Sequence, residues 1–282
     1  MGRIERTLTL IGQSFSIIMA DKELLWFPIF SGIACVSISV VMLSGGALAF
    51  LPQLEAMKAV GNGPQPLSPG MWSWLLAFYL VNYFLVIFFN VALVSVAYDR
   101  IAGGHANMND GLQIAWQRKG TILQWALLDA TVGILLRSIQ ERMGWLGRIV
   151  TDMVGIAWNL ATYFIVPILA MEDLGPMEAL SRSADLFRQT WGEELAGGFS
   201  FGLLFGLLAL PGILLPIYGA SRGGSTAIVG IVLAIVYWLL LGVVNSTVQG
   251  VFTAALYRYA TTKEVPRGFD SSSLQQAWQP KS

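Results

Sequence analysis

The sequence predicts an all-α fold: a polytopic bundle of about six transmembrane helices, with interfacial amphipathic helices on the cytoplasmic side. Of the 282 residues, 55% are hydrophobic and 12% are charged, which is about half the charged share of a soluble domain. Five apolar stretches without Lys or Arg are long enough to cross a hydrocarbon core of about 30 Å. They lack the alternation of a barrel, so we expect helices, which satisfy their own backbone groups in lipid.

A sixth, weaker stretch completes three hydrophobic hairpins. Thr121–Ser138 is short and carries Asp129 at its centre. A central Asp costs roughly 2.5–3.5 kcal/mol on insertion scales, and the neighbouring Leu and Ile residues offset part of that cost. The expected spans are Leu24–Leu51, Trp72–Ala97, Thr121–Ser138, Ile149–Met171, Leu195–Ile217 and Thr226–Gln249.

The basic residues predict the orientation, because cytoplasmic loops accumulate Lys and Arg. Six spans with an inner N-terminus place 12 of the 17 Lys and Arg residues in the cytoplasm and 5 outside. If Thr121–Ser138 stayed in the cytoplasm, the division would become 10 against 7. We therefore expect a multi-pass protein of the cell (inner) membrane with both termini cytoplasmic. Residues 1–260 would form one transmembrane domain, and residues 261–282 a polar cytoplasmic tail.

Three inner segments have apolar residues at helical spacing, three or four positions apart. These residues are Ile4, Leu8, Ile11, Phe15 and Ile18; Met108, Leu112, Ala115 and Trp116; and Met177, Leu180, Ala184, Phe187 and Trp191. Such helices can lie at the membrane interface with the apolar face toward acyl chains, and Phe187 and Trp191 are candidate contacts for protein partners. Because each segment precedes a charged break and a hydrophobic hairpin, the pattern suggests an internal repeat.

Three polar residues fall near the middle of their spans: Asp129, Asn82 and Asn159. They could form one intramembrane cluster, with Tyr83 and Tyr163 as hydroxyl neighbours. An ionisable group at this depth suggests a substrate or proton site. The alternative is a structural cluster, in which interhelical hydrogen bonds hold the bundle together. A carboxyl group with no basic partner at the same depth favours the structural interpretation, and both remain open.

The remaining composition argues against several classes of site. A single cysteine, Cys35, and a single histidine, His105, exclude a disulfide framework and the usual metal clusters. Equal numbers of basic and acidic residues, 17 of each, give no sign of a nucleic-acid partner. We expect no metal and no cofactor, and the lipid bilayer as the main partner.

One pentapeptide matches the form of a catalytic motif. Gly198–Gly202 has the Gly-x-Ser-x-Gly pattern of a nucleophile elbow, which requires a strand-to-helix turn and a nearby base. Here Ser200 lies inside an apolar helix, and the only histidine belongs to a distant loop. Gly198, Gly202 and Gly206 instead recur every four residues, as in close helix packing. We therefore expect no enzymatic activity.

Several short motifs resemble a known family. Ala20–Pro28, Ala157–Tyr163 with Pro167, and Ala179–Ser183 with Trp191–Glu193 resemble an uncharacterised family of prokaryotic six-span integral membrane proteins, a domain of unknown function. That resemblance implies a topology and no activity. The chain also resembles, more loosely, the membrane domain attached to some glycerophosphodiester phosphodiesterases, whose hydrolytic domain has no counterpart here.

Two classes of function follow. The absence of catalytic groups and the amphipathic inner helices favour a non-enzymatic membrane protein, acting in assembly, organisation or protein contacts. The alternative is a transporter or lipid-handling protein that uses the polar cluster around Asp129, since transporter folds often contain internal repeats.

Overall fold

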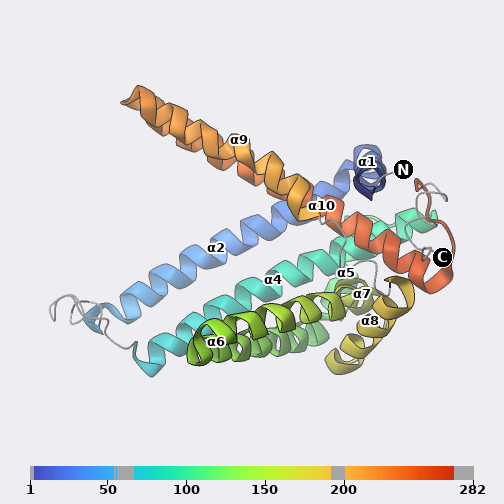
Figure 1. The fold of residues 1–282 in the computed structure, drawn as a ribbon, viewed down its shortest axis with the longest axis horizontal. Helices are drawn as coiled ribbons and strands as arrows, with labels where there is room; N and C mark the ends of the chain where they lie inside the picture. Colours follow the sequence, from blue (N-terminus) through green and yellow to red (C-terminus); the bar gives the residue numbers. More distant parts are fainter. Residues whose placement is uncertain (1–2, 54, 56–66, 192–200, 270–282) are drawn as a thin grey trace.

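A computed structural model describes residues 3–53, 55, 67–191 and 201–269, which are almost entirely helical and include no strand (Figure 1). In chain order the elements are α1 (Arg3–Ala20), the 3-10 helix η1 (Lys22–Leu25), α2 (Trp26–Ala49), α4 (Pro69–Ala102), α5 (Met108–Gln117), α6 (Lys119–Ala161), α7 (Ile165–Met171), α8 (Pro176–Trp191), α9 (Phe201–Arg222) and α10 (Ser225–Thr262). The all-α prediction is confirmed.

Six helical segments are long and apolar enough to cross a membrane: Lys22–Ala49, Pro69–Ala102, Lys119–Trp145, Gly147–Met171, Phe205–Arg222 and Ser225–Thr262. Each overlaps an expected span, including the weaker Thr121–Ser138. The third and fourth segments share α6, which Gly144 interrupts at φ 58° and ψ −129°, a conformation that favours glycine. The two arms of α6 run side by side in opposite directions (Figure 1).

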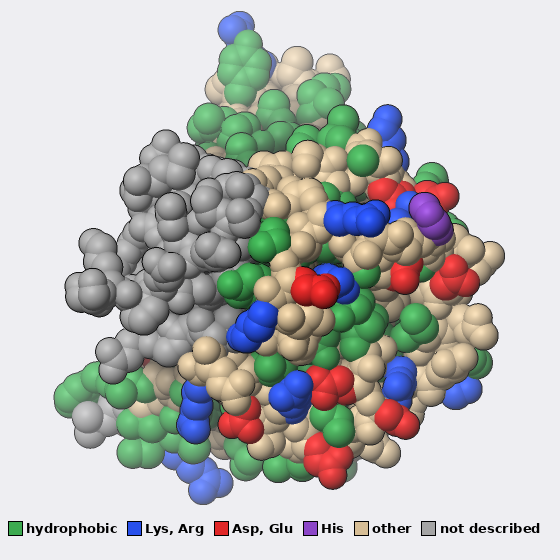
Figure 2. Space-filling model, turned by 90° about the vertical axis from the view of Figure 1, so that its right-hand side faces the viewer, with side chains coloured by type: hydrophobic (Ala, Val, Ile, Leu, Met, Phe, Trp, Pro, Cys, Tyr) green, Lys and Arg blue, Asp and Glu red, His purple; other side chains and the backbone are tan. Residues whose placement is uncertain are grey.

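The buried core lies at one end of the molecule, where α1, α5, α7 and α8 gather around α4 and α10 (Figure 1). We call this the polar end, because Figure 2 shows acidic and basic side chains intermixed over it. Buried side chains here include Val91, Leu93, Ile122, Phe164, Leu169 and Ala255. Both α4 and α10 continue past the expected ends at Ala97 and Gln249, because their last turns pack in this core instead of leaving the bilayer as coil.

Toward the opposite, far end the α9–α10 hairpin separates from the other two hairpins. The α9–α10 hairpin runs to the upper left in Figure 1, away from α2 and α4, and α9 packs mainly on α10. Large apolar side chains are consequently uncovered: Leu48 on α2 is 75% exposed and Leu239 on α10 is 64% exposed. Surfaces of this kind are rare on soluble monomers and are ordinary when lipid is the solvent.

Inside the α9–α10 hairpin, small residues allow the two backbones to approach. A Cβ added to Gly230 would lie 2.7 Å from the carbonyl oxygen of Leu215. Trp238 Nε1 donates a hydrogen bond to the Ala209 carbonyl at 3.2 Å. Of the expected glycine stripe, Gly206 lies in open space and does not make this contact, and Gly198 and Ser200 lie outside the described residues. The close approach occurs further along α9, beyond the stripe.

Part of the apolar face of α8 packs against the chain's own helices, whereas Met177 at the start of that face is 63% exposed. Phe187 is only 7% exposed and its ring lies 6.1 Å from that of Tyr163, edge on. Phe187 is therefore buried against the chain's own residues, and a role as a partner contact stays a prediction. The Trp191 side chain lies outside the described side chains. Helical periodicity in the sequence predicts which residues share a face of α8, but it does not predict what covers that face.

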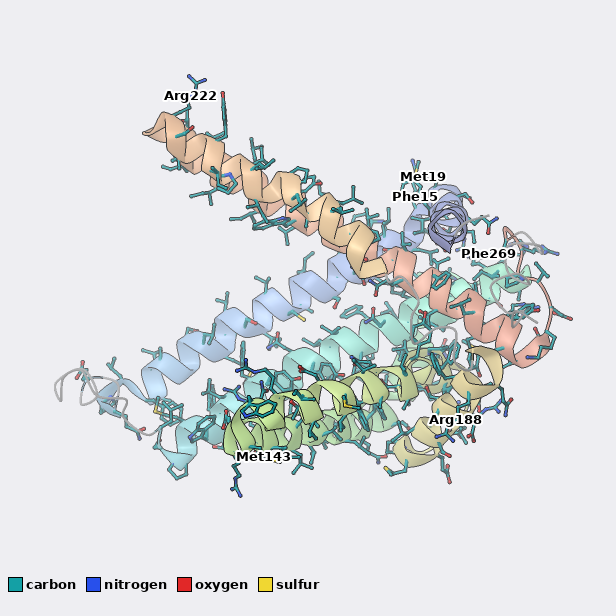
Figure 3. All side chains as sticks on the ribbon, viewed as in Figure 1. Phe15, Met19, Met143, Arg188, Arg222 and Phe269 are labelled. Carbon is teal, nitrogen blue, oxygen red and sulfur yellow. The ribbon has the colours of Figure 1, made fainter. Side chains whose placement is uncertain are left out.

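The faces of α1 and α5 divide between core and surroundings. Ile18 is buried, whereas Phe15 and Met19 are exposed on the outer side of α1 (Figure 3). On α5, Ala115 is buried and Trp116 exposed. The order of elements nevertheless matches the suggested repeat three times, because a short helix precedes each of the α2–α4, α6 and α9–α10 hairpins.

Ion pairs join the short helices at the polar end. Arg100, at the end of α4, pairs with Asp21 just before η1. Arg182 on α8 lies 3.2 Å from Glu172, whose carboxylate also accepts a hydrogen bond from the Tyr257 hydroxyl of α10 at 2.6 Å. These contacts link four elements that are distant in sequence, and they fix the end from which the hairpins diverge.

Candidate functional site: the Asp129 network

Asp129 is bonded by donors from two other helical segments. Its Oδ1 accepts a hydrogen bond from Trp158 Nε1 at 2.6 Å, and its Oδ2 accepts one from the Tyr83 hydroxyl. Tyr83 belongs to α4, whereas Asp129 and Trp158 belong to the first and second arms of α6. The carboxyl group therefore connects α4 with both arms of α6.

The reversal at Gly144 explains why these residues meet. Asp129 lies fifteen residues before Gly144 and Trp158 fourteen residues after it, so antiparallel helices with the same rise place them at equal depth. Stacked rings support the arrangement. Trp158 lies parallel to the buried Trp125, with centroids 6.1 Å apart and an interplanar angle of 5°. The indole ring is held in place, and its N–H is directed at the carboxylate.

The two amides expected in this cluster do not reach Asp129. Asn82 accepts a hydrogen bond from the Ser39 hydroxyl of α2 at 3.2 Å, and its amide donates to the Phe78 carbonyl at 2.9 Å. Asn159 is exposed. Consecutive helical residues point about 100° apart, so a helix that turns Tyr83 toward α6 turns Asn82 toward α2. Trp158 and Asn159 are separated in the same way.

Only one of the two tyrosines predicted to lie beside Asp129 does so. Tyr83 is confirmed as a hydroxyl neighbour of Asp129. Tyr163 instead lies in the polar-end core, with its ring 5.2 Å from that of Phe164. Trp158 is the residue that the sequence interpretation missed. Its position in the sequence could have predicted this contact. Trp158 lies at the depth of Asp129, and the indole N–H of a buried Trp usually finds an acceptor.

Chemically, the arrangement presents a carboxylate that accepts on both oxygens. Hydrogen bonds to an ionised acceptor are shorter and stronger than neutral ones, so the network is suited to hold helices together. Arg137, two turns toward the far end, pairs with Glu141 at 2.9 Å and not with Asp129. Among the described residues, no group of three or more His, Cys, Asp or Glu side chains could hold a metal ion. His105 is exposed in its loop.

Six long apolar helices in an all-α arrangement define a polytopic membrane protein. The family described as a family of unknown function (DUF6159) matches residues 70–267, and the chain belongs to it. This agrees with the resemblance to a family of unknown function. No curated protein and no solved structure is similar enough to the chain to count as a match. The looser resemblance to the phosphodiesterase membrane domain stays a prediction.

Proposed function

We propose that this protein is non-enzymatic and organises the lipid around it, in the cell membrane and with both termini cytoplasmic. One observation supports the proposal most directly: the α9–α10 hairpin shares a core with the other two hairpins at the polar end and diverges from them toward the far end. In a bilayer, the space between diverging hairpins is filled by acyl chains or by other membrane helices.

The character of the exposed faces favours acyl chains. Helices associate in lipid through small residues and polar side chains, because lipid tails compete equally for bulky apolar surfaces. In the α9–α10 hairpin the small residues Gly219 and Gly230 already face each other, with a Cβ at either position 3.2 Å from the other Cα. The outward faces carry bulky side chains such as Leu214, Ile228 and Leu239, all exposed. These surfaces suit lipid better than a partner helix.

The charge distribution supports the orientation. Most Lys and Arg residues lie on the segments that join the hairpins at the polar end, which by the positive-inside rule faces the cytoplasm. Phe15 and Met19 of α1 and Trp26 at the start of α2 are exposed beside this charged surface. Aromatic and long apolar side chains at this level can enter the interface between headgroups and acyl chains.

A transporter or lipid-handling protein with its site at Asp129 is the competing proposal. It is supported by the ionisable group at mid-depth. The bonding of both carboxylate oxygens supports the structural alternative, in which Asp129 holds both arms of α6 against α4.

Photo-crosslinking in native membranes tests the proposal. Benzoylphenylalanine in place of Leu239 should give a phospholipid adduct by mass spectrometry, and the same residue in place of the buried Leu256 should crosslink within the chain. A protein adduct at Leu239 would overturn the lipid assignment in favour of protein contacts. Proton flux into vesicles that contain the protein, abolished by Asp129→Asn in a folded variant, would favour the transporter instead.

A further inference from the structure

An open cleft with a volume of about 710 Å³ lies between the two arms of α6, on the far-end side of Asp129. Its lining residues are Gly133, Leu136, Arg137, Gln140, Glu141, Arg148, Thr151 and Asp152. The charged members lie within eight residues of Gly144, which is about 12 Å at the helical rise. Figure 3 shows Met143 at this end of the hairpin. At this depth a span approaches the headgroup region.

The cleft contains two cations and two anions. Arg137 and Glu141 pair along the first arm, with Nε and Oε1 2.9 Å apart. On the second arm, Arg148 and Asp152 are both exposed, and neither belongs to an ion pair among the described residues. The cleft therefore offers one cation and one anion for a ligand, with no net charge.

Other lining residues make room or add donors without competing for the charges. A Cβ added to Gly133 would meet nothing within 4 Å, so this position opens the cleft wall. Thr151 is buried, and its hydroxyl donates to the carbonyl oxygen of Gly147 at 2.9 Å, so its proton is not available to a ligand. Gln140 can donate through its amide.

The surface around the cleft is apolar. Leu135 on the first arm and Met153 on the second are exposed, and Leu136 lines the cleft itself. A ligand with a charged group in the cleft would thus extend along bulky apolar side chains. This combination of a compact polar site and an adjoining apolar surface matches a phospholipid, with its headgroup in the cleft and its acyl chains on α6.

We propose that this cleft binds the headgroup of a zwitterionic phospholipid. Arg148 binds the phosphate through charge-assisted hydrogen bonds, and Asp152 binds the ammonium group. An anionic headgroup fits less well, because Asp152 and Glu141 would repel it. This inference rests on the proposed lipid contact and adds the headgroup class.

Native mass spectrometry of the purified protein tests the assignment, with phosphatidylethanolamine and phosphatidylglycerol as the two probes. We expect the zwitterionic lipid to bind better. Arg148→Gln should weaken its binding about tenfold or more, since a hydrogen bond to a charged group contributes that much. Asp152→Asn should shift the preference toward phosphatidylglycerol.

Arg222→Gln is the matched control, because Arg222 is exposed at the far end of α9 and away from the cleft (Figure 3). It should leave both affinities unchanged. Equal binding of both lipids, a preference for phosphatidylglycerol, or equal losses in Arg148→Gln and Arg222→Gln would overturn the cleft assignment. Lipid adducts at Leu239 together with any of these results would leave the proposed function intact.

Discussion

Replacing Asp129 with asparagine tests whether the network holds the helices together. The carboxamide oxygen can still accept from Trp158 Nε1, but its NH₂ group then faces the Tyr83 hydroxyl, which must change from donor to acceptor. Hydrogen bonds between membrane helices contribute about 0.6 kcal/mol on average and at most about 1.7 kcal/mol. Because the change weakens the bonds to both partners without deleting either, we expect a stability loss of about 1 kcal/mol.

The assay is equilibrium unfolding of the purified protein in mixed micelles, followed by tryptophan fluorescence and circular dichroism. A double-mutant cycle of Tyr83→Phe and Asp129→Ala isolates the pair and should give a coupling of about 0.6–1.7 kcal/mol. Asn159→Ala is the control, because Asn159 is exposed and surface changes usually stay within about 0.5 kcal/mol. Wild-type stability for Asp129→Asn, or additive effects in the cycle, would refute the structural role of Asp129.

Three further substitutions probe the packing, each by the same unfolding measurement. Gly230→Ala should lower the free energy of unfolding by about 1–3 kcal/mol, because its methyl group would collide with the α9 backbone. Gly242→Ala, on the same helix, is the control: its methyl group meets open space, so it should be neutral or stabilising. Equal effects of the two substitutions would contradict the close approach. Ser183→Ala should lower the free energy of unfolding by about 1–3 kcal/mol. The buried Ser183 hydroxyl accepts a hydrogen bond from the Phe164 backbone amide at 3.0 Å, and the substitution removes that acceptor. An unchanged unfolding midpoint would argue against this bond. Gly144→Ala should cost about 1–3 kcal/mol through backbone strain at its positive φ, and a stabilised variant would mean that the arms reverse elsewhere.

The spans were predictable because hydrophobicity and length are local properties. Even Thr121–Ser138, with Asp129 at its centre, was recovered once the distribution of Lys and Arg was included, and the structure gives Lys119–Trp145 in its place. The ends of α4 and α10 were placed too early. Their last turns are buried by other parts of the chain, and local hydropathy does not register such burial.

The sequence predicted how deep in the spans the site lies, but not which side chains face one another there. Counting residues placed Asp129, Asn82 and Asn159 at mid-span, and the network does lie there. Which neighbour faces Asp129 depends on how each helix is rotated about its axis, and one residue of sequence corresponds to about 100°. Tyr83 and Trp158 therefore occupy the positions expected for Asn82 and Asn159.

By itself, then, the sequence predicted that lipid surrounds most of this protein, how many spans it has and the depth of the Asp129 carboxyl group. These properties follow from composition along the chain. Tertiary structure alone decided that Phe187 turns inward, that Gly219 meets Gly230, and that the α9–α10 hairpin meets the other two hairpins at only one end. Those features depend on helix rotation and crossing, which are set by contacts between residues far apart in sequence.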